Sequence, residues 1–553
     1  MVQYCKKKGD VMTNNFKKII DRQMWVQTAP TSNAHSAGMG LACDMRNDMS
    51  RNPVAYQLTS ATVLNRYNFV TKSWDFLGSP ALGGTFGAGA GCVFAPSFSL
   101  VGTLAAGATD SSIIINTPFP TAVGTNMLSN RGGSGEYGFR IRIIGNAVGS
   151  SGLIEERWII ANSEGTTPTI VLSNPLSFTP VAGDSYEIIS GKLYMLSAGV
   201  QSATSFKSLE VASNTIASLS QTNLPSTVST DFSAVALDEQ YVPYNKKPGE
   251  GFISGSATYD TSGLTPKGCL QATGVGANTL TGQATGGDSA VLENEYRNFQ
   301  IRIVEDTSMP TAVNQRRIIK SHTQGTSPVY TTGTNWTVTP SSNAKYVIEN
   351  PNVILLWTTA NAVTYTYNYT TQTISNGTNS INANAWHVTY FGNRGGNMGA
   401  GCTSIPSFGI EVDINKYSRH SYIFSFRGGN TSTLDMLDIA GDTTGLWSNN
   451  IVYDGKTKNL TTGSCGKYAP FDNEGRFGYL DIYTASLYNQ IYRFDVKARV
   501  LATFTPTDWI QAGTAAAGDR LAACCVIDGN DRYSMLLLIS HLSTIAQEFL
   551  TLV

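Results

Sequence analysis

"GFRIRII" at residues 138–144 reappears as "NFQIRIV" at residues 298–304, and this repetition decides how the chain is divided. A shift of 160 positions aligns residues 138–188 with residues 298–348 without a gap, and 13 of the 51 pairs are identical. In both copies apolar residues alternate with polar ones, which is typical of a β-strand with one buried face. A repeat of this length indicates a duplicated structural unit.

The shared positions continue beyond this strand. Arg157 matches Arg317, and "EGTTP" matches "QGTSP", in which Gly165 and Gly325 mark a turn. Further on, "FTPVAGDSYEI" matches "VTPSSNAKYVI", where a turn precedes a closing strand. Each copy therefore predicts four or five short strands, a small β-barrel or sandwich of about 80 residues with its flanks.

A second repeat lies outside these two modules and reads as a hairpin. In each copy an apolar or aromatic residue, an Asn, Asp or Glu, and a further apolar residue are followed by a polar turn. The five copies are "RYNFVTKSW" (66–74), "SLEVASNTI" (208–216), "TYNYTTQTI" (366–374), "MLDIAGDTT" (436–444) and "RFDVKARVL" (493–501).

A glycine-rich motif also occurs twice, as "GAGCVFAPSF" (89–98) and "GAGCTSIPSF" (399–408), identical at seven of ten places. Such glycines permit close approach of two backbones and positive φ angles. The apolar stretches "GKLYMLSAG" (191–199) and "NVILLWTTA" (352–360) then precede two of the hairpins. The recurring order is a glycine-rich strand, an apolar strand and a hairpin.

This order resembles the blade of a kelch-type β-propeller, and Tyr67, Asn68, Thr71 and Trp74 come nearest to the spacing of that family. The resemblance implies an all-β fold, a kelch-like β-propeller of six or seven blades. We expect an N-terminal arm (1–50), a discontinuous propeller (51–104, 190–266 and 350–553) and two inserted β modules (105–189 and 267–349).

Composition excludes several classes of protein. Hydrophobic residues make up 41% of the chain and charged residues only 14%, against roughly 25% in a typical soluble domain. The net charge of −1 argues against a protein that binds nucleic acid by neutralising phosphates. The eight cysteines contain no CxxC pair, which favours free thiols in a reducing compartment. Neither a secretory signal nor 18 consecutive apolar residues is found, so we expect no membrane insertion.

Residues for catalysis or cofactor binding are not evident in the sequence. A glycosidase needs two facing carboxylates, but the candidates Glu155, Glu156, Asp438 and Asp442 all fall in hairpins or turns, where solvated acids are common. No HExxH or GxSxG motif occurs. The histidines are scattered, at His35, His322, His387, His420 and His541. Most tryptophans are expected in the core or at subunit contacts: Trp25, Trp74, Trp158, Trp386 and Trp447. We therefore predict no catalytic residue, metal or cofactor, and a protein that is not an enzyme.

The sequence of the first module, from "FRIRII" through "ERWII" to "GDSYEI", is similar to short β segments in structural proteins of tailed bacteriophages. The propeller with inserted β domains resembles the tail nozzle proteins of short-tailed phages. This resemblance implies a virion structural subunit of the nozzle, neck or baseplate, assembled in the host cytoplasm. Its expected partners are copies of itself in a six- or twelve-fold ring, other tail or neck proteins, and DNA in transit without specific binding. The alternative is a propeller that binds or cleaves carbohydrate during host recognition.

Overall fold

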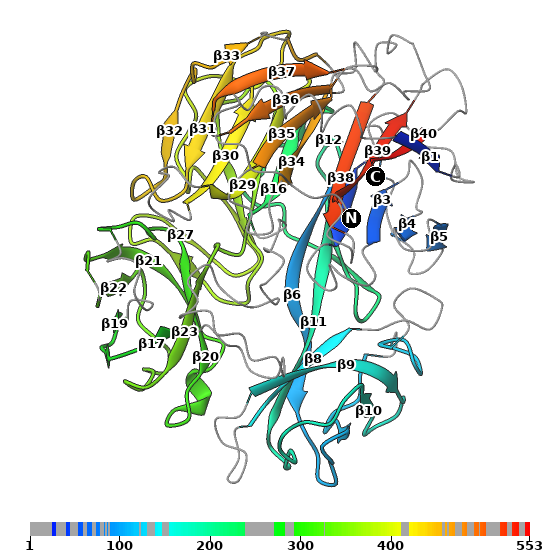
Figure 1. Ribbon diagram of the computed structural model, residues 1–553, viewed down its shortest axis with the longest axis vertical. Helices are drawn as coiled ribbons and strands as arrows, with labels where there is room; N and C mark the ends of the chain where they lie inside the picture. Colours follow the sequence, from blue (N-terminus) through cyan, green and yellow to red (C-terminus); the bar gives the residue numbers. More distant parts are fainter. Residues whose placement is uncertain are drawn as a thin grey trace, which may run out of the picture.

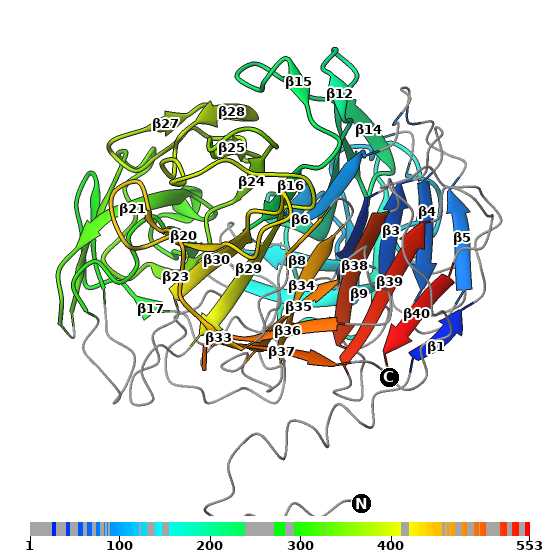
Figure 2. The same ribbon diagram turned by 90° about the horizontal axis from the view of Figure 1, so that it is seen from above.

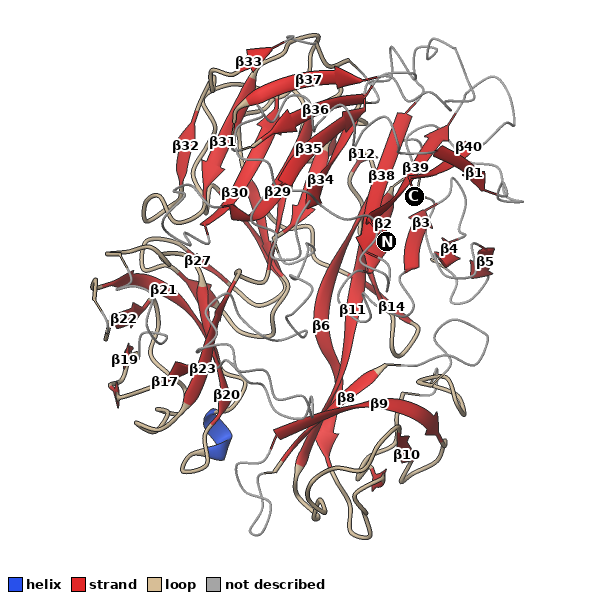
Figure 3. Ribbon diagram, viewed as in Figure 1, coloured by secondary structure: helices blue, strands red, loops and turns tan. Residues whose placement is uncertain are grey.

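The computed structural model of this chain describes most of the two repeats and the strands of the propeller. The described residues are 25–28, 40–44, 54–58, 64–68, 73–77, 82, 86, 89–120, 123–129, 139–145, 154–237, 270–282, 292–325, 327–410, 420–455, 459–461, 464–470, 478–483, 491–496, 498–504, 520–527, 533–540 and 548–552. Within them the elements are strands, apart from one short 3₁₀ helix, η1 (Pro310–Ala312), shown in blue in Figure 3.

Six groups of four antiparallel strands form the upper part of the molecule in Figure 1. In chain order of their first strands, they are β2 (Leu41–Asp44), β3 (Val54–Leu58), β4 (Leu64–Asn68) and β5 (Ser73–Leu77); β6 (Gly91–Thr103), β11 (Ser185–Leu196), β13 (Phe206–Glu210) and β14 (Thr215–Ser218); β16 (Ser233–Ala236), β24 (Val353–Trp357), β25 (Tyr365–Asn368) and β28 (Ala385–Val388); β29 (Thr403–Ile410), β30 (His420–Phe426), β31 (Leu434–Asp438) and β32 (Leu446–Ser448); β34 (Cys465–Pro470), β35 (Gly478–Tyr483), β36 (Ile491–Asp495) and β37 (Val500–Phe504); and β38 (Arg520–Ile527), β39 (Tyr533–Ser540), β40 (Glu548–Leu552) and β1 (Trp25–Thr28). We number these groups blades 1 to 6 in this order.

The first strands of the blades pack in a closed order. Strand β2 contacts β6, β6 contacts β16, and the series continues through β29, β34 and β38 back to β2. The ring closes through the last blade, because β1, from the start of the chain, pairs with β40, from its end. Figure 2 shows β38, β39, β40 and β1 side by side. The all-β propeller predicted from the sequence is confirmed, and this closure protects the edges that an open sheet would expose.

The sequence motifs occupy equivalent places in the blades. Four of the five predicted hairpins join the third strand of a blade to the fourth, as in β4 to β5 and β36 to β37. In blade 3, residues 366–374 lead instead from β25 into β26 (Ile374–Ser375), which precedes the fourth strand, β28. The glycine motif begins the first strands β6 and β29. A Cβ on Gly89 would lie 2.6 Å from the carbonyl oxygen of Thr230, and one on Gly399 would lie 2.4 Å from the Cα of Gly429. At both positions the neighbouring backbone is too close to leave room for a Cβ, so glycine is required.

Module 1 is a small barrel that grows out of blade 2. Strands β6 and β11 run from the blade into the module, where their distal halves remain paired (Figure 1). The pairing then passes from β11 to β8 (Arg140–Ile144), β9 (Ile154–Asn162), β10 (Thr169–Leu172) and β7 (Ser112–Ile114). A bridge between Leu104 and Ile115 returns the order to β6. Because β11 is one strand, it crosses the border predicted between residues 189 and 190.

Module 2 repeats this order between the first and second strands of blade 3. Its sheet runs β17 (Leu270–Gln271), β23 (Lys345–Glu349), β20 (Gln300–Glu305), β21 (Arg316–His322), β22 (Val329–Thr332), β19 (Thr279–Thr281) and β18 (Gly274–Val275). The two modules therefore occupy the same position in adjacent blades. Their surroundings differ: the core of module 2 is continuous with apolar residues of blades 3 and 4, whereas module 1 has a separate core.

Two expectations need correction. Residues 1–50 were expected to form an arm, but β1 and β2 lie within this range and belong to blades 6 and 1. The repeated strand was expected to have one solvated face, yet Arg140 and Arg142 on β8 are 9% and 3% exposed, and Arg302 on β20 is fully buried. The sequence pattern identified the inward residues correctly, but the outward arginines of module 1 form ion pairs with Glu156 on β9 and Glu187 on β11 instead of facing solvent.

Candidate functional site

The paired arginines of the repeat, Arg157 and Arg317, hold the same loop in both modules. Arg157 Nε donates to the carbonyl oxygen of Pro175 at 3.0 Å, and its Nη2 donates to Glu155 Oε2 at 2.7 Å. Arg317 Nε donates in the same way to the carbonyl oxygen of Asn335 at 2.8 Å. Burial lowers the pKa of Arg157, which the charge of Glu155 partly offsets. These arginines are structural cross-links, because their donors are used by the fold.

The four carboxylates considered for glycoside hydrolysis do not form a pair around a common substrate position. Glu155 is buried in module 1, where Ser177 N–H also donates to it at 3.0 Å. Glu156 accepts from Arg142 Nε at 2.9 Å. Asp438, in blade 4, accepts from the N–H of Ala440 at 2.9 Å, and Asp442 forms an exposed ion pair with Arg297 at 3.5 Å. Glu155 and Glu156 thus belong to a different domain from Asp438 and Asp442.

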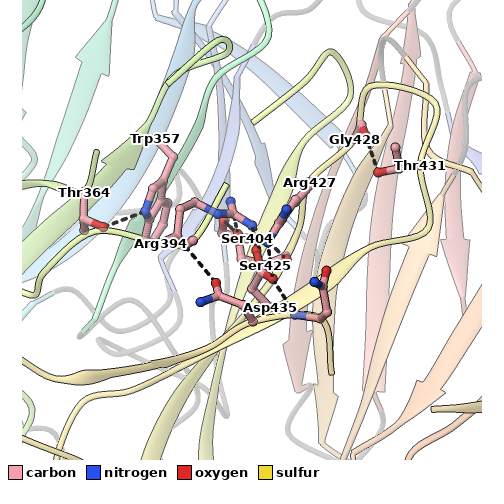
Figure 4. Close-up of polar contacts among 12 residues, drawn as sticks. Trp357, Thr364, Arg394, Ser404, Ser425, Arg427, Gly428, Thr431 and Asp435 are labelled. Atoms are coloured by element: carbon pink, nitrogen blue, oxygen red, sulfur yellow. Dashed lines mark hydrogen bonds and ion pairs between the residues drawn. The ribbon is translucent and has the colours of Figure 1, made fainter. Parts of the chain in front are cut away.

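A deeply buried charged cluster lies in blade 4, and Figure 4 shows it in close-up. Arg394, from the segment between β28 and β29, donates to Asp435 on β31 and to Ser425 Oγ on β30 at 3.0 Å. Arg427 also binds Asp435, through Nε at 2.8 Å and Nη2 at 3.0 Å. The N–H of Asn450 is a further donor to Asp435, at 2.9 Å.

The charges of this cluster determine its protonation. Burial raises the pKa of the Asp435 carboxyl, but the bonds from Arg427, Arg394 and the N–H of Asn450 outweigh it and leave the pKa below its ordinary value. Burial also lowers the pKa of Arg394, whose side chain is 0% exposed. Two guanidinium groups and one carboxylate leave one net positive charge. Of the two guanidinium groups, that of Arg427 is the one in contact with solvent, since its side chain is 20% exposed and that of Arg394 is 0% exposed.

Aromatic side chains complete this cluster. The guanidinium carbon of Arg394 lies 5.5 Å from the centroid of the Trp447 ring, and Trp447 packs edge-on against Trp357 at 6.1 Å. Trp357 Nε1 donates to Thr364 Oγ1 at 3.1 Å (Figure 4). Of this cluster the sequence indicated only Trp447 as a core or contact residue; the pairing of Arg394 with Asp435 was not predicted, because the two residues are 41 positions apart and share no motif. These hydrogen bonds hold the segment between blades 3 and 4 against the sheet of blade 4.

A polar contact joins the two modules. The Nδ2 amide of Asn314, between η1 and β21, donates a hydrogen bond to Glu187 Oε1 on β11. Glu187 also lies 3.6 Å from Arg142, which binds Glu156 at 2.6 Å. The outward arginines of the repeated strand in module 1 therefore belong to a buried ion-pair network at the side that faces module 2.

His322 is held by hydrogen bonds within module 2. His322 Nε2 accepts the N–H of Tyr296 at 2.9 Å, and its Nδ1 lies 2.9 Å from the carbonyl oxygen of Thr323. Burial lowers the pKa of His322 to about 4 and also lowers the pKa of His387. Of the other histidines in the sequence, His35 and His541 lie outside the described residues, and the side chain of His420 on β30 is also outside them. Among the residues that are described, no group of three or more His, Cys, Asp or Glu side chains could hold a metal ion.

Tryptophans occupy both interior and surface positions. Trp357, Trp386 and Trp336 are buried, with Trp386 packed 5.2 Å from Phe206 between blades 2 and 3. Trp158, on the outer face of β9, is only partly covered, and Arg140 lies 5.3 Å from its ring centroid. Within the described part of the chain, no helix is long and apolar enough to span a membrane.

Comparison with known proteins adds little at the level of sequence, because no family model and no curated protein matches this chain. Solved structures of the NanB sialidase from Streptococcus pneumoniae match this chain over nearly the whole length of both chains. A point mutant of this sialidase has 7% identity and a TM-score of 0.21, covering 96% of this chain and 93% of that one. NanB with Optactamide has 6% identity and a TM-score of 0.21, covering 96% and 94%.

The prediction that the chain is not an enzyme is not upheld by these comparisons, because the structures that match are of a sialidase, which is an enzyme. A third NanB structure, in complex with 2-[(3-chlorobenzyl)ammonio]ethanesulfonate, has 6% identity and a TM-score of 0.20, covering 96% of this chain and 93% of that one. Likeness at this level says nothing about a reaction, a substrate or a catalytic residue, and we assign none of these to the chain.

Proposed function

We propose that this chain is a structural subunit of a tailed-phage virion, a ring-forming component of the tail nozzle, neck or baseplate that helps to form the DNA conduit. The observation that carries the proposal is the pair of like barrels set at equivalent positions of adjacent blades. A module inserted twice between the first and second strands of a blade projects two similar surfaces from one propeller. Such repeated surfaces suit repeated contacts with neighbouring subunits.

The anchoring of the modules supports an assembly role. Module 2 is held on blade 4 by Asn298 Nδ2, which donates to the carbonyl oxygens of Ile439 at 2.7 Å and Asp442 at 2.8 Å. Module 1 shares β6 and β11 with its blade and contacts module 2 through Glu187. Surfaces that are fixed in this way bind at a lower entropic cost than surfaces on flexible tethers.

The charge of the chain is also compatible with this role. Charged residues are only 14% of the chain and the net charge is −1. Interface cores are depleted of charged residues, and a conduit that carries DNA without holding it needs no strong cationic lining. The proposed partners are copies of the chain in a six- or twelve-fold ring and other tail or neck proteins, and the proposed location is the virion.

Mass spectrometry of virions purified on a density gradient tests the proposal. We expect this chain as a stoichiometric component, with a copy number that is a multiple of six. Its absence from purified particles would contradict the structural role. Turnover of a host glycan by the isolated chain, with no particle association, would instead favour action on carbohydrate.

A further inference from the structure

Both modules carry a β-bulge at the same place, and the bulge turns an additional side chain outward. In module 1 the register between β9 and β10 shifts so that Leu172 pairs with Ile159 and Val171 pairs with Ala161. Ile160 is therefore the extra residue. In module 2 the register of β21 and β22 shifts across Lys320 in the same way. Bulges of this kind redirect side chains and are often found at functional surfaces.

In module 2 an element of the chain itself packs beside the bulge, although Lys320 at the bulge is exposed. The connection between β25 and β28 contains a small hairpin, β26 (Ile374–Ser375) and β27 (Ser380–Ile381), and β26 packs against β21. A Cβ on Gly377 would lie 2.6 Å from Lys320 Cδ, so the lysine stem lies directly on the hairpin. Ile318, two residues before Lys320, is 2% exposed in the same apolar cluster as Ile374 and Ile381.

In module 1 the corresponding face is apolar and lacks this neighbouring hairpin. The equivalent connection of blade 2, between β13 and β14, is only the short turn 211–214. Ile160 stands where module 2 has Lys320, and its side chain is 49% exposed. Val171 stands where module 2 has Thr331, and both Val171 and Trp158 are partly exposed. We call these three residues the bulge face of module 1. An exposed apolar group of this type marks an interaction surface.

We infer that the bulge face of module 1, formed by Trp158, Ile160 and Val171, binds a second copy of this chain. The occupant follows from module 2, in which an element of this same chain, the β26–β27 hairpin, already packs beside the equivalent bulge. The inference rests on the proposed ring, because a face used once per subunit against a different surface of the next copy gives a heterologous contact, and such contacts close into rings.

The pattern of substitution between the modules agrees with this assignment. The module with the hairpin beside its bulge has a lysine there, and a lysine can leave its charged end in water. The module without the hairpin has an isoleucine, which gains nothing from exposure to solvent. The contact is small by itself, and repetition around a ring increases its effect through multivalency.

Sedimentation velocity over a concentration series tests the inference by comparing the wild type with the variant Ile160→Lys. Ile160→Lys places in module 1 the residue that module 2 carries at the same bulge. Val200→Lys is the matched control, because Val200 is 79% exposed on β12 (Gly199–Val200), which is paired only with β15 (Thr227–Val228) among the described strands. We expect self-association of the wild type, about tenfold or greater weakening by Ile160→Lys, and no change by Val200→Lys.

A wild type that stays monomeric throughout the series would overturn the inference, and so would equal association of the wild type and Ile160→Lys. A midpoint temperature of thermal unfolding equal to that of the wild type shows that the Ile160→Lys variant is folded. Incorporation into particles is measured separately. A chain that enters virions but associates regardless of Ile160 would refute this contact and leave the proposed structural role intact.

Discussion

Asn314 of module 2 donates a hydrogen bond to Glu187 of module 1, although the two residues are 127 positions apart. Glu187 is 7% exposed and lies beside Arg142, so the amide contributes to a buried ion-pair network. The two barrels therefore stabilise one another across a polar contact rather than an apolar core. A hydrogen bond to a buried carboxylate is among the stronger ones in proteins.

The contact predicts energetic coupling between the modules. In a double-mutant cycle of Asn314→Ala and Glu187→Gln, we expect a coupling energy of about 1 to 2 kcal/mol in the free energy of unfolding. Chemical denaturation of the wild type, the two single variants and the double variant measures it. Additive single effects would mean that the modules are energetically independent.

Asp435 should be essential to the stability of blade 4. Asp435→Asn leaves Arg394 and Arg427 sharing a neutral amide, with the side chain of Arg394 fully buried. We expect a loss of about 3 to 5 kcal/mol in the free energy of unfolding. Asp442→Asn is the control, because that side chain is 61% exposed, and it should change stability by less than about 0.5 kcal/mol. Similar values for the two variants would contradict the role of Asp435.

His322 predicts a specific dependence of stability on pH. Burial holds its pKa at about 4 in the folded state, against 6.5 in the unfolded chain. The neutral ring is needed because Nε2 accepts the Tyr296 N–H. Its contribution is therefore complete above pH 6.5 and is lost as the pH falls from 6.5 towards 4, by up to about 3 kcal/mol.

Module 1 supplies the variant that tests this dependence. Asn162 occupies the position equivalent to His322, and its Oδ1 accepts the N–H of Leu128 at 2.8 Å. His322→Asn should therefore keep the fold and flatten the curve of unfolding free energy against pH between 6.5 and 4. If the variant retained the wild-type slope, another group would be responsible.

The buried pair of Arg157 and Glu155 should tolerate Glu155→Gln but not Arg157→Met. Glu155→Gln reproduces module 2, where Gln315 Oε1 accepts the N–H of Thr337 at 2.8 Å, so we expect a loss below about 1 kcal/mol. Arg157→Met leaves the Glu155 carboxylate buried without its cation and should cost about 3 kcal/mol or more. Thermal or urea unfolding distinguishes them, and a reversed order would refute this explanation of the repeat.

Local patterns in the sequence predicted much of the fold. The alternation of Ile141 and Ile143 with arginines identified the core of module 1, since side chains of a strand point to opposite faces. The hairpins and the glycine motif marked equivalent strands of several blades, because turn chemistry and close backbone contact depend on nearby residues. Residues 1–50 were harder to interpret, since pairing of β1 with β40 depends on the opposite end of the chain.

Relationships over long distances in sequence were decided only by the tertiary structure. Nothing in the pattern around Arg394 indicates that Asp435 is its partner, and nothing around Glu187 indicates Asn314. Even the repeat is longer than it appears in sequence: Asn126 and Asn294 have the same left-handed backbone and bind Asn162 and His322, but they are offset by 168 positions instead of 160. The sequence by itself determined the strands, the turns and the duplication, because these follow from local sterics and burial. The tertiary structure decided which charges are buried together and which of two like faces stays exposed, because both depend on what the rest of the chain brings against them.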